Sequence, residues 1–151
     1  MPQSLSKVLI HLIFSTKNRA PFLKDPQHRD ALIGYLIGIL KNLECPSLIV
    51  NGVEDHIHIL CGLSRNITLA QLVEEIKRSS SRWAKTHDAS LRDFYWQNGY
   101  AAFSVSESGV PAVRRYIENQ AEHHRRVSFQ DELRAFFHRH NVEFDERYVW
   151  D

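Results

Sequence analysis

Apolar residues recur along the chain with the spacing of strands in some stretches and of helices in others. The expected strands, in chain order, are residues 7–15, 47–53, 56–63 and an aromatic-rich stretch at 94–105 that Asn98 and Gly99 interrupt. The expected helices are residues 26–42, 69–86, about 112–124 and a short last one from about 129 to 140. Asp25, Thr68 and Ser128 precede three of these helices and are residue types that cap a helix N-terminus.

This order of elements, βαββαβ followed by helices, predicts an α+β fold of the ferredoxin-like kind. We expect an antiparallel sheet of four strands with two helices on one face, plus C-terminal helices. The chain fits a single domain of residues 1–151, with a core at about 5–126 and a C-terminal extension at about 127–151. Because this fold hosts many functions, it does not decide the activity.

Composition is ordinary for a soluble globular protein, with 43% hydrophobic and 25% charged residues. The longest apolar run, residues 32–40, is interrupted by two glycines and a tyrosine and is too short to cross a bilayer. The N-terminus lacks the pattern of a signal peptide, and the two cysteines, Cys45 and Cys61, are isolated. We therefore expect a cytoplasmic protein with free thiols and no membrane partner.

A formal net charge of +1 hides local clusters of basic residues. Five of them fall between Lys77 and Arg92, and four more arginines lie within residues 114–126. Toward the C-terminus the chain leans acidic. Such local positive surface suits nucleic-acid contacts, and nine histidines make a metal or phosphate site worth seeking.

The first motif with chemical meaning is His56-Ile57-His58, on the third expected strand. Side chains alternate between the faces of a strand, so His56 and His58 share one face about 7 Å apart along the strand. Two imidazoles so placed can share a divalent metal ion. On this motif alone, two histidines on a half-exposed strand remain the simpler interpretation.

The second motif places Tyr116 and Gln120 one helical turn apart on the same face of a helix. A protonated phenol is a poor nucleophile, so Tyr116 needs a metal or base beside it to attack a phosphate. Gln120 offers a neutral oxygen as a third metal ligand. Taken in isolation, an amphipathic helix with a solvated Gln120 explains the same residues.

Two further stretches combine groups that suit nucleic acid. Residues 77–83 mix cations, serines and Trp83 at the end of a helix, where phosphate contacts and base stacking are one interpretation and a solvated helix face is another. Residues 94–100 are rich in aromatic side chains that either stack on unpaired bases or belong to the core.

Taken together, these residues resemble those of HUH-type single-tyrosine transposases, carried by small bacterial insertion sequences, and their relatives associated with repetitive extragenic palindromes. The segments that carry the resemblance are 11–19 (HLIFSTKNR), 55–60 (DHIHIL), 76–81 (IKRSSS), 96–100 (WQNGY), 103–106 (FSVS) and 116–120 (YIENQ) with 123–125 (HHR). Their joint order and spacing carry the resemblance, since no single segment is specific.

The resemblance implies a mechanism and its residues. His56, His58 and Gln120 would hold Mg²⁺ or Mn²⁺, and Tyr116 would attack single-stranded DNA to form a 5′-phosphotyrosine and free a 3′-OH. It also implies a homodimer that recognises hairpin DNA at the ends of a mobile element. The expected DNA contacts are Lys17, Arg19, Lys77 and Arg82.

Other functions remain open at the level of sequence. A replication-type HUH nickase would share the chemistry but is generally larger. A non-catalytic or domesticated relative would bind hairpin DNA, and a non-catalytic module on a ferredoxin-like sheet would bind nucleic acid through aromatic residues on its central strands. A small metal hydrolase would cleave with water, and only the tyrosine mechanism produces a covalent protein–DNA adduct.

Overall fold

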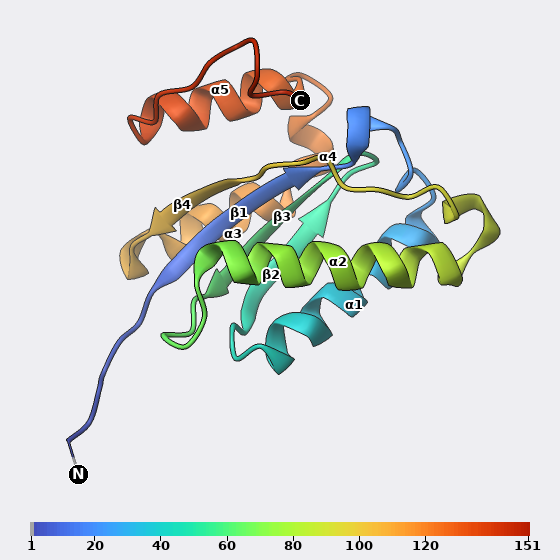
Figure 1. Ribbon diagram of the computed structural model, residues 1–151. Helices are drawn as coiled ribbons and strands as arrows, with labels where there is room; N and C mark the ends of the chain where they lie inside the picture. The colour runs from blue at the N-terminus through green and yellow to red at the C-terminus, as the bar shows by residue number, and fades with distance from the viewer. Residues whose placement is uncertain (1) are drawn as a thin grey trace.

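A four-stranded antiparallel sheet forms the centre of the protein, which a computed structural model describes from residue 2 to residue 151 (Figure 1). The strands are β1 (Leu9–Ser15), β2 (Ser47–Gly52), β3 (His56–Gly62) and β4 (Ala101–Val105). They lie in the order β2-β3-β1-β4, and every neighbouring pair is antiparallel. This order is that of a ferredoxin-like sheet, so the predicted fold class is confirmed.

One face of the sheet is covered by α1 (Pro26–Asn42) and α2 (Leu69–His87) (Figure 1). The predicted caps form: the Asp25 side chain accepts a hydrogen bond from the Gln27 N–H, and Thr68 makes a capping box with Gln71. Alternate strand positions point into this layer, among them the fully buried Leu12, Ile57 and Ile59. The opposite positions on β1 and β3 are thereby turned to the other face.

That other face is covered by the C-terminal helices α3 (Val110–Glu118), α4 (Gln120–His123) and α5 (Phe129–Arg139). The prediction of one continuous helix over 112–124 is wrong, because the helix breaks at Asn119. Asn51 on β2 explains the break: its side-chain amide donates to the carbonyl oxygens of Ile117 (2.8 Å) and Glu118 (3.4 Å). Those carbonyls would otherwise accept from the next helical turn.

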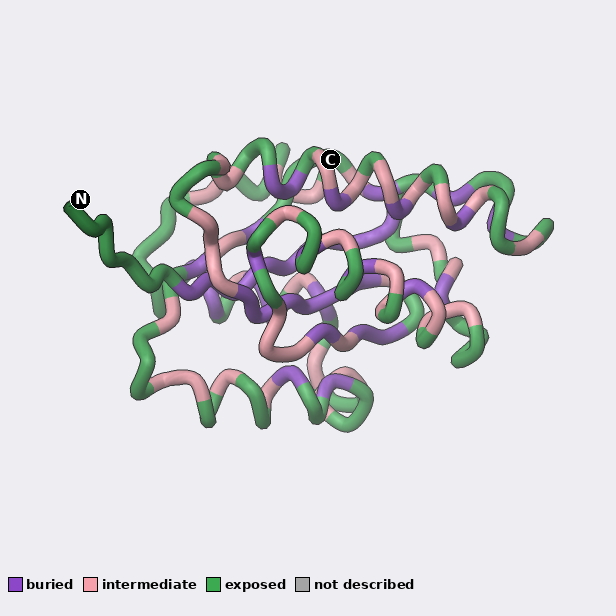
Figure 2. Tube along the Cα trace, turned by 90° about the horizontal axis from the view of Figure 1, so that it is seen from below, coloured by how far each residue is buried: buried purple, intermediate pink, exposed green. Residues whose placement is uncertain are grey.

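A second, smaller core fixes α5 on the sheet. Its buried members are Ile13, Ala101, Phe103, Phe129, Leu133, Phe136 and Phe137. Buried positions follow the strands and the inner sides of the flanking helices (Figure 2). Since a fully buried leucine or phenylalanine contributes roughly 1.5–3 kcal/mol, α5 is an integral part of the fold. The extension predicted from residue 127 therefore packs on the domain.

The aromatic stretch 94–105 forms less strand than expected. Only β4 joins the sheet, and residues 94–100 approach it through a single bridge between Thr16 and Trp96. Gly99 adopts a φ of 84°, in the left-handed region that favours glycine, and turns the chain into β4. Phe94 and Trp96 are buried whereas Tyr95 and Tyr100 are 55% and 43% exposed, so the stretch divides between core and surface.

Lys77 holds this turn in place. Its ammonium group donates to the carbonyl oxygens of Gln97 (2.8 Å) and Gly99 and lies 5.5 Å from the centre of the Phe14 ring. Burial lowers its pKa to about 8. This placement gives Lys77 a structural role besides the predicted DNA contact.

We expect Lys77→Ala to lower the free energy of unfolding by about 1–2 kcal/mol, because two carbonyl groups lose a charged donor. Urea denaturation followed by circular dichroism measures it. Arg82→Ala on the same helix, whose side chain is exposed, is the matched control and should change stability by less than about 0.5 kcal/mol. Equal stability of the two variants would show that Lys77 does not have this structural role.

Across residues 2–151, none of the helices combines the length and the apolar character needed to span a membrane.

Candidate active site

The sheet turns three histidines toward the C-terminal helices. His56 and His58 alternate on β3 with Ile57 and Ile59, which point into the main core, and His11 occupies the same face of β1. All three histidines are buried. The two residues of the His56-Ile57-His58 motif therefore share one face beneath α3, α4 and α5.

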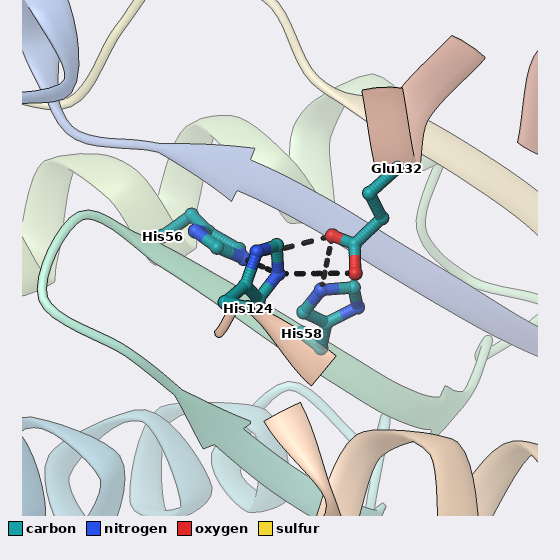
Figure 3. A group of neighbouring side chains, drawn as sticks. All are labelled: His56, His58, His124 and Glu132. Atoms are coloured by element: carbon teal, nitrogen blue, oxygen red, sulfur yellow. Dashed lines mark hydrogen bonds and ion pairs between the residues drawn. The ribbon is translucent and has the colours of Figure 1, made fainter. Parts of the chain in front are cut away.

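His124, directly after α4, and Glu132 on α5 complete a compact group with the β3 histidines. The Nε2 atoms of His56, His58 and His124 and the carboxylate of Glu132 offer ligand atoms that all lie within 4.8 Å of one another (Figure 3). Glu132 Oε1 is 2.9 Å from His58 Nε2, and its Oε2 is 3.1 Å from His124 Nε2. His56 Nε2 and His124 Nε2 are 2.9 Å apart.

The opposite ring nitrogens of the three imidazoles are each held by a neighbour. His56 Nδ1 bonds the Asp55 carboxylate (2.7 Å), and His124 Nδ1 bonds the carbonyl oxygen of Val127 (2.9 Å). His58 Nδ1 bonds His11 Nε2 (2.8 Å). Because a carboxylate and a carbonyl only accept, the Nδ1 atoms of His56 and His124 donate to them, which directs both Nε2 atoms into the group.

These nitrogen positions fit a cation. Two imidazole lone pairs facing one another at 2.9 Å repel unless a metal ion or a proton lies between them. Three inward nitrogens and one carboxylate, each oriented from behind, form the donor set of a divalent metal site. The residues present therefore fit the metal that the sequence motif suggests.

The protonation of His58 and His11 agrees with that fit, whereas for His56 burial is outweighed by the hydrogen bonds to Asp55 and Glu132, which raise the pKa. Burial lowers the pKa of His58 to about 4 and that of His11 to about 3, so both are neutral near pH 7, as a metal ligand and its hydrogen-bond partner should be. Burial opposes ionisation of Glu132, but its contacts with the surrounding histidines outweigh it and hold the pKa of that carboxyl well below its usual range. Glu132 therefore supplies a full negative charge.

Tyr116 on α3 meets this group through Glu132. Its hydroxyl donates to Glu132 Oε2 and lies 3.2 Å from His123 Nε2. Burial, followed by the negative charge of Glu132, raises the pKa of the Tyr116 phenol above its ordinary value. The phenol is thus held protonated at the edge of the site.

Access to Tyr116 runs through a surface pocket of about 740 Å³. Tyr116 and His123 line it together with two exposed arginines, Arg115 and Arg126. Since the same two residues reach inward to Glu132, this pocket connects solvent with the site. Against the single carboxylate of Glu122, 3.9 Å from the Arg126 guanidinium, the two arginines leave the pocket with a net positive charge that suits a phosphate.

Gln120, the third ligand expected from the sequence, lies at the margin of the group. It is buried, its Oε1 is 3.0 Å from His124 Nε2, and its amide nitrogen donates to the Tyr116 carbonyl oxygen (3.3 Å). Its oxygen is thus as near the inward Nε2 of His124 as the Glu132 carboxylate, which lies 3.1 Å away. The structure thus brings Gln120 close to the site and offers His124 and Glu132 as further ligands.

Sequence reasoning missed His124 and Glu132 as members of the site. For Glu132 a signal existed: Phe129, Leu133 and Phe136 form the apolar stripe of α5, and Glu132 falls on that stripe. An acidic side chain on the buried side of a helix needs hydrogen-bonding or charged partners. Such a residue is therefore a candidate member of a functional site. For His124 the sequence offered no signal beyond its position in the His123-His124 pair.

The expected DNA contacts are spread over two regions. Lys17 and Arg19 are exposed on the 3₁₀ turn η1 (Lys17–Arg19) that follows β1, and Arg82 is exposed on α2. Lys77 is half-buried against residues 97–99. Lys17 reaches the same loop, because its N–H donates to the carbonyl oxygen of Tyr95 (2.8 Å).

Comparison with known proteins identifies the family. A family model described as "Transposase IS200 like" matches residues 4–120, so the chain belongs to the IS200-like transposases, and a transposase is a DNA-processing enzyme. The match ends at Gln120, and both His124 and Glu132 lie beyond it. No curated protein sequence matches the chain.

Two solved structures share the fold. A protein of Deinococcus radiodurans R1, assigned as a transposase, is 25% identical with a TM-score of 0.62 over 80% of this chain and 95% of that one. A REP-associated tyrosine transposase bound to a REP hairpin is 16% identical, with a TM-score of 0.51 over 78% of this chain and 67% of that one. The second likeness concerns the fold alone.

Proposed function

We propose that this transposase cuts and rejoins single-stranded DNA through a covalent bond to Tyr116. The observation that carries the proposal is the position of Glu132, whose carboxylate contacts the Tyr116 hydroxyl with one oxygen and the convergent histidines with both. A nucleophile and a candidate metal site are thereby adjacent. Such adjacency is what activation of a weakly nucleophilic phenol requires.

His56, His58, His124 and Glu132 would hold the metal, with Gln120 beside them. A bound divalent ion would polarise a phosphate oxygen and offset the charge that builds on it during attack. The resemblance suggests Mg²⁺ or Mn²⁺, and the nitrogen-rich donor set favours Mn²⁺ of the two. His11 and Asp55 would keep the two β3 imidazoles oriented.

In the reaction, the Tyr116 oxygen attacks the phosphorus of a phosphodiester. The bond to the 3′ oxygen breaks as the phenol proton passes to His123, and the departing oxygen takes up a proton from water, which leaves a free 3′-OH and a 5′-phosphotyrosine. Rejoining is the reverse attack by a 3′-OH. The phosphodiester energy is retained in the tyrosine linkage, so no nucleotide hydrolysis is required.

The proposed substrate is single-stranded DNA with a hairpin. The relative of shared fold is bound to a REP hairpin, and the arginine-lined pocket at Tyr116 suits a sugar-phosphate chain. A homodimer and a cytoplasmic location follow from the resemblance and belong to the same proposal.

The test uses labelled hairpin DNA from the genomic flanks of the gene, incubated with the protein and Mn²⁺ or Mg²⁺ and run on a denaturing gel. Label that migrates with the protein and disappears with EDTA supports the proposal. Cleavage without an adduct would identify a hydrolase, and binding without cleavage a non-catalytic or domesticated relative. Either result would overturn the tyrosine mechanism.

The exposed basic residues give a separate prediction for DNA binding. Replacing Lys17, Arg19 and Arg82 by alanine should reduce the slope of log affinity against log salt concentration by about 2, since each lost phosphate contact on single strands contributes about 0.7. Fluorescence anisotropy with labelled hairpin DNA across a salt series measures the slope. Lys41→Ala, exposed at the end of α1, is the control, and an unchanged slope in the triple variant would place the DNA elsewhere.

A further inference from the structure

A second pocket, of about 390 Å³, lies beside the candidate site at the end of β1. Its floor is apolar and includes Ile13, Ala101 and Leu133. Its rim carries the exposed side chains of Arg19 and Asn98. A mostly apolar hollow with a few polar groups at its rim is the usual form of a small-ligand site.

Phe129 places this pocket next to the proposed reaction centre. It lines the pocket, and its ring centre is 4.5 Å from that of His56. Leu133, in the floor, directly follows Glu132 on α5. Phe129 therefore borders both the pocket and one of the candidate metal ligands.

The backbone beside the rim is held in an unusual conformation. Asn18 and Arg19 both have positive φ values, 57° and 53°, in the left-handed region that non-glycine residues seldom adopt. The Asn18 N–H bonds Gln97 Oε1 (2.8 Å), which stabilises the turn and fixes the pocket side chain Gln97. Strain of this kind clusters at ligand sites, and here it sets the position of Arg19 in the pocket lining.

The C-terminal segment forms the outer wall of the pocket with Tyr148 and Trp150. Arg134 on α5 binds both carboxylate oxygens of Glu146 (2.7 and 3.0 Å), and the Trp150 indole donates to the same carboxylate (2.9 Å). The wall is therefore tied to α5. Both the wall and α5 lie outside the matched segment 4–120, so the extension closes a pocket whose other side belongs to that segment.

We propose that this pocket binds one unpaired base of the DNA strand next to the phosphate that Tyr116 attacks, and that it selects among bases. The proposal rests on the proposed function and adds a specificity site to it. The apolar floor and the aromatic wall can pack against the faces of a base. The side chains of Asn98 and Arg19 can form hydrogen bonds with its edge.

The test measures base preference apart from catalysis. Labelled octamers dA8, dC8, dG8 and dT8 are titrated by anisotropy into the Tyr116→Phe protein, which cannot cleave. We expect one octamer to bind about tenfold more tightly than another, and Ala101→Leu, which fills the floor of the pocket, to remove that preference. Ala135→Leu, the same change at an exposed position of α5, should keep it.

Asn98→Ala provides a second variant on the exposed rim, where folding is not at stake. It should change the order of preference among the four octamers. If both Ala101→Leu and Asn98→Ala bind the octamers as the parent does, the pocket proposal is wrong. The proposed function would still stand if the wild-type protein formed its covalent adduct, whereas absence of both adduct and strand binding would overturn both.

Discussion

Tyr116→Phe is expected to abolish the covalent protein–DNA adduct and to lower strand cleavage by roughly 10³-fold or more, because the variant has no oxygen with which to attack phosphorus. The measurement is the denaturing gel with labelled hairpin DNA and Mn²⁺, run as a time course for both proteins. Hairpin affinity, measured by anisotropy, should stay within about threefold, since the change removes one hydroxyl and no cation.

The fold should tolerate this change. The Phe ring can keep the contacts of Tyr116 with His58 and Phe136, whose ring centres lie 5.8 and 5.4 Å away. Glu132 retains His58 and His124 as partners, so the variant should melt within a few degrees of the wild type. Tyr35→Phe, on α1 across the sheet from the site, is the matched control and should form the adduct normally. Adduct formation by Tyr116→Phe at the wild-type rate would refute the assignment.

The parts of this fold that sequence predicts are those fixed by local chemistry. Asp25 and Thr68 cap their helices as expected, because a cap depends only on the next three residues. The alternation through His56, Ile57 and His58 likewise places two imidazoles on one face and an isoleucine on the other, since the strand period is two. The order of elements then predicts the sheet.

What sequence does not predict depends on contacts between distant segments. The helix break at Asn119 arises from Asn51 on β2, and the irregular path of residues 97–99 from Lys77 on α2. Glu132 reaches His58 only because an aromatic core brings α5 back over β1 and β4. Each contact joins residues whose separation along the chain carries no signal in a single sequence.

A large effect on metal binding is expected from His124→Ala, and it decides between two ligand sets. The sequence motif assigns His56, His58 and Gln120, whereas the structure brings together His56, His58, His124 and Glu132. Removing His124 takes away an inward Nε2 that Val127 orients from behind. We expect Mn²⁺ affinity, measured by isothermal titration calorimetry, to fall by at least about 100-fold.

Gln120→Ala should weaken Mn²⁺ binding less than tenfold, because three imidazole nitrogens and the Glu132 carboxylate would remain to bind the ion. His138→Ala, exposed on α5, controls for the loss of a histidine as such. The reverse order, with Gln120→Ala the more damaging change, would establish Gln120 as the third ligand and His124 as its support.

Thermal melting tests independently whether His124 contributes to a metal site. At a Mn²⁺ concentration about 100 times the dissociation constant, a site present only in the folded state stabilises it by about 2.7 kcal/mol, which raises the Tm of a chain of this size by about 5–10 °C. Wild type and His138→Ala should show this rise, and His124→Ala should lose most of it. A wild-type Tm that does not respond to Mn²⁺ would mean that the converged histidines bind no such ion, and the metal-assisted mechanism would fail with them.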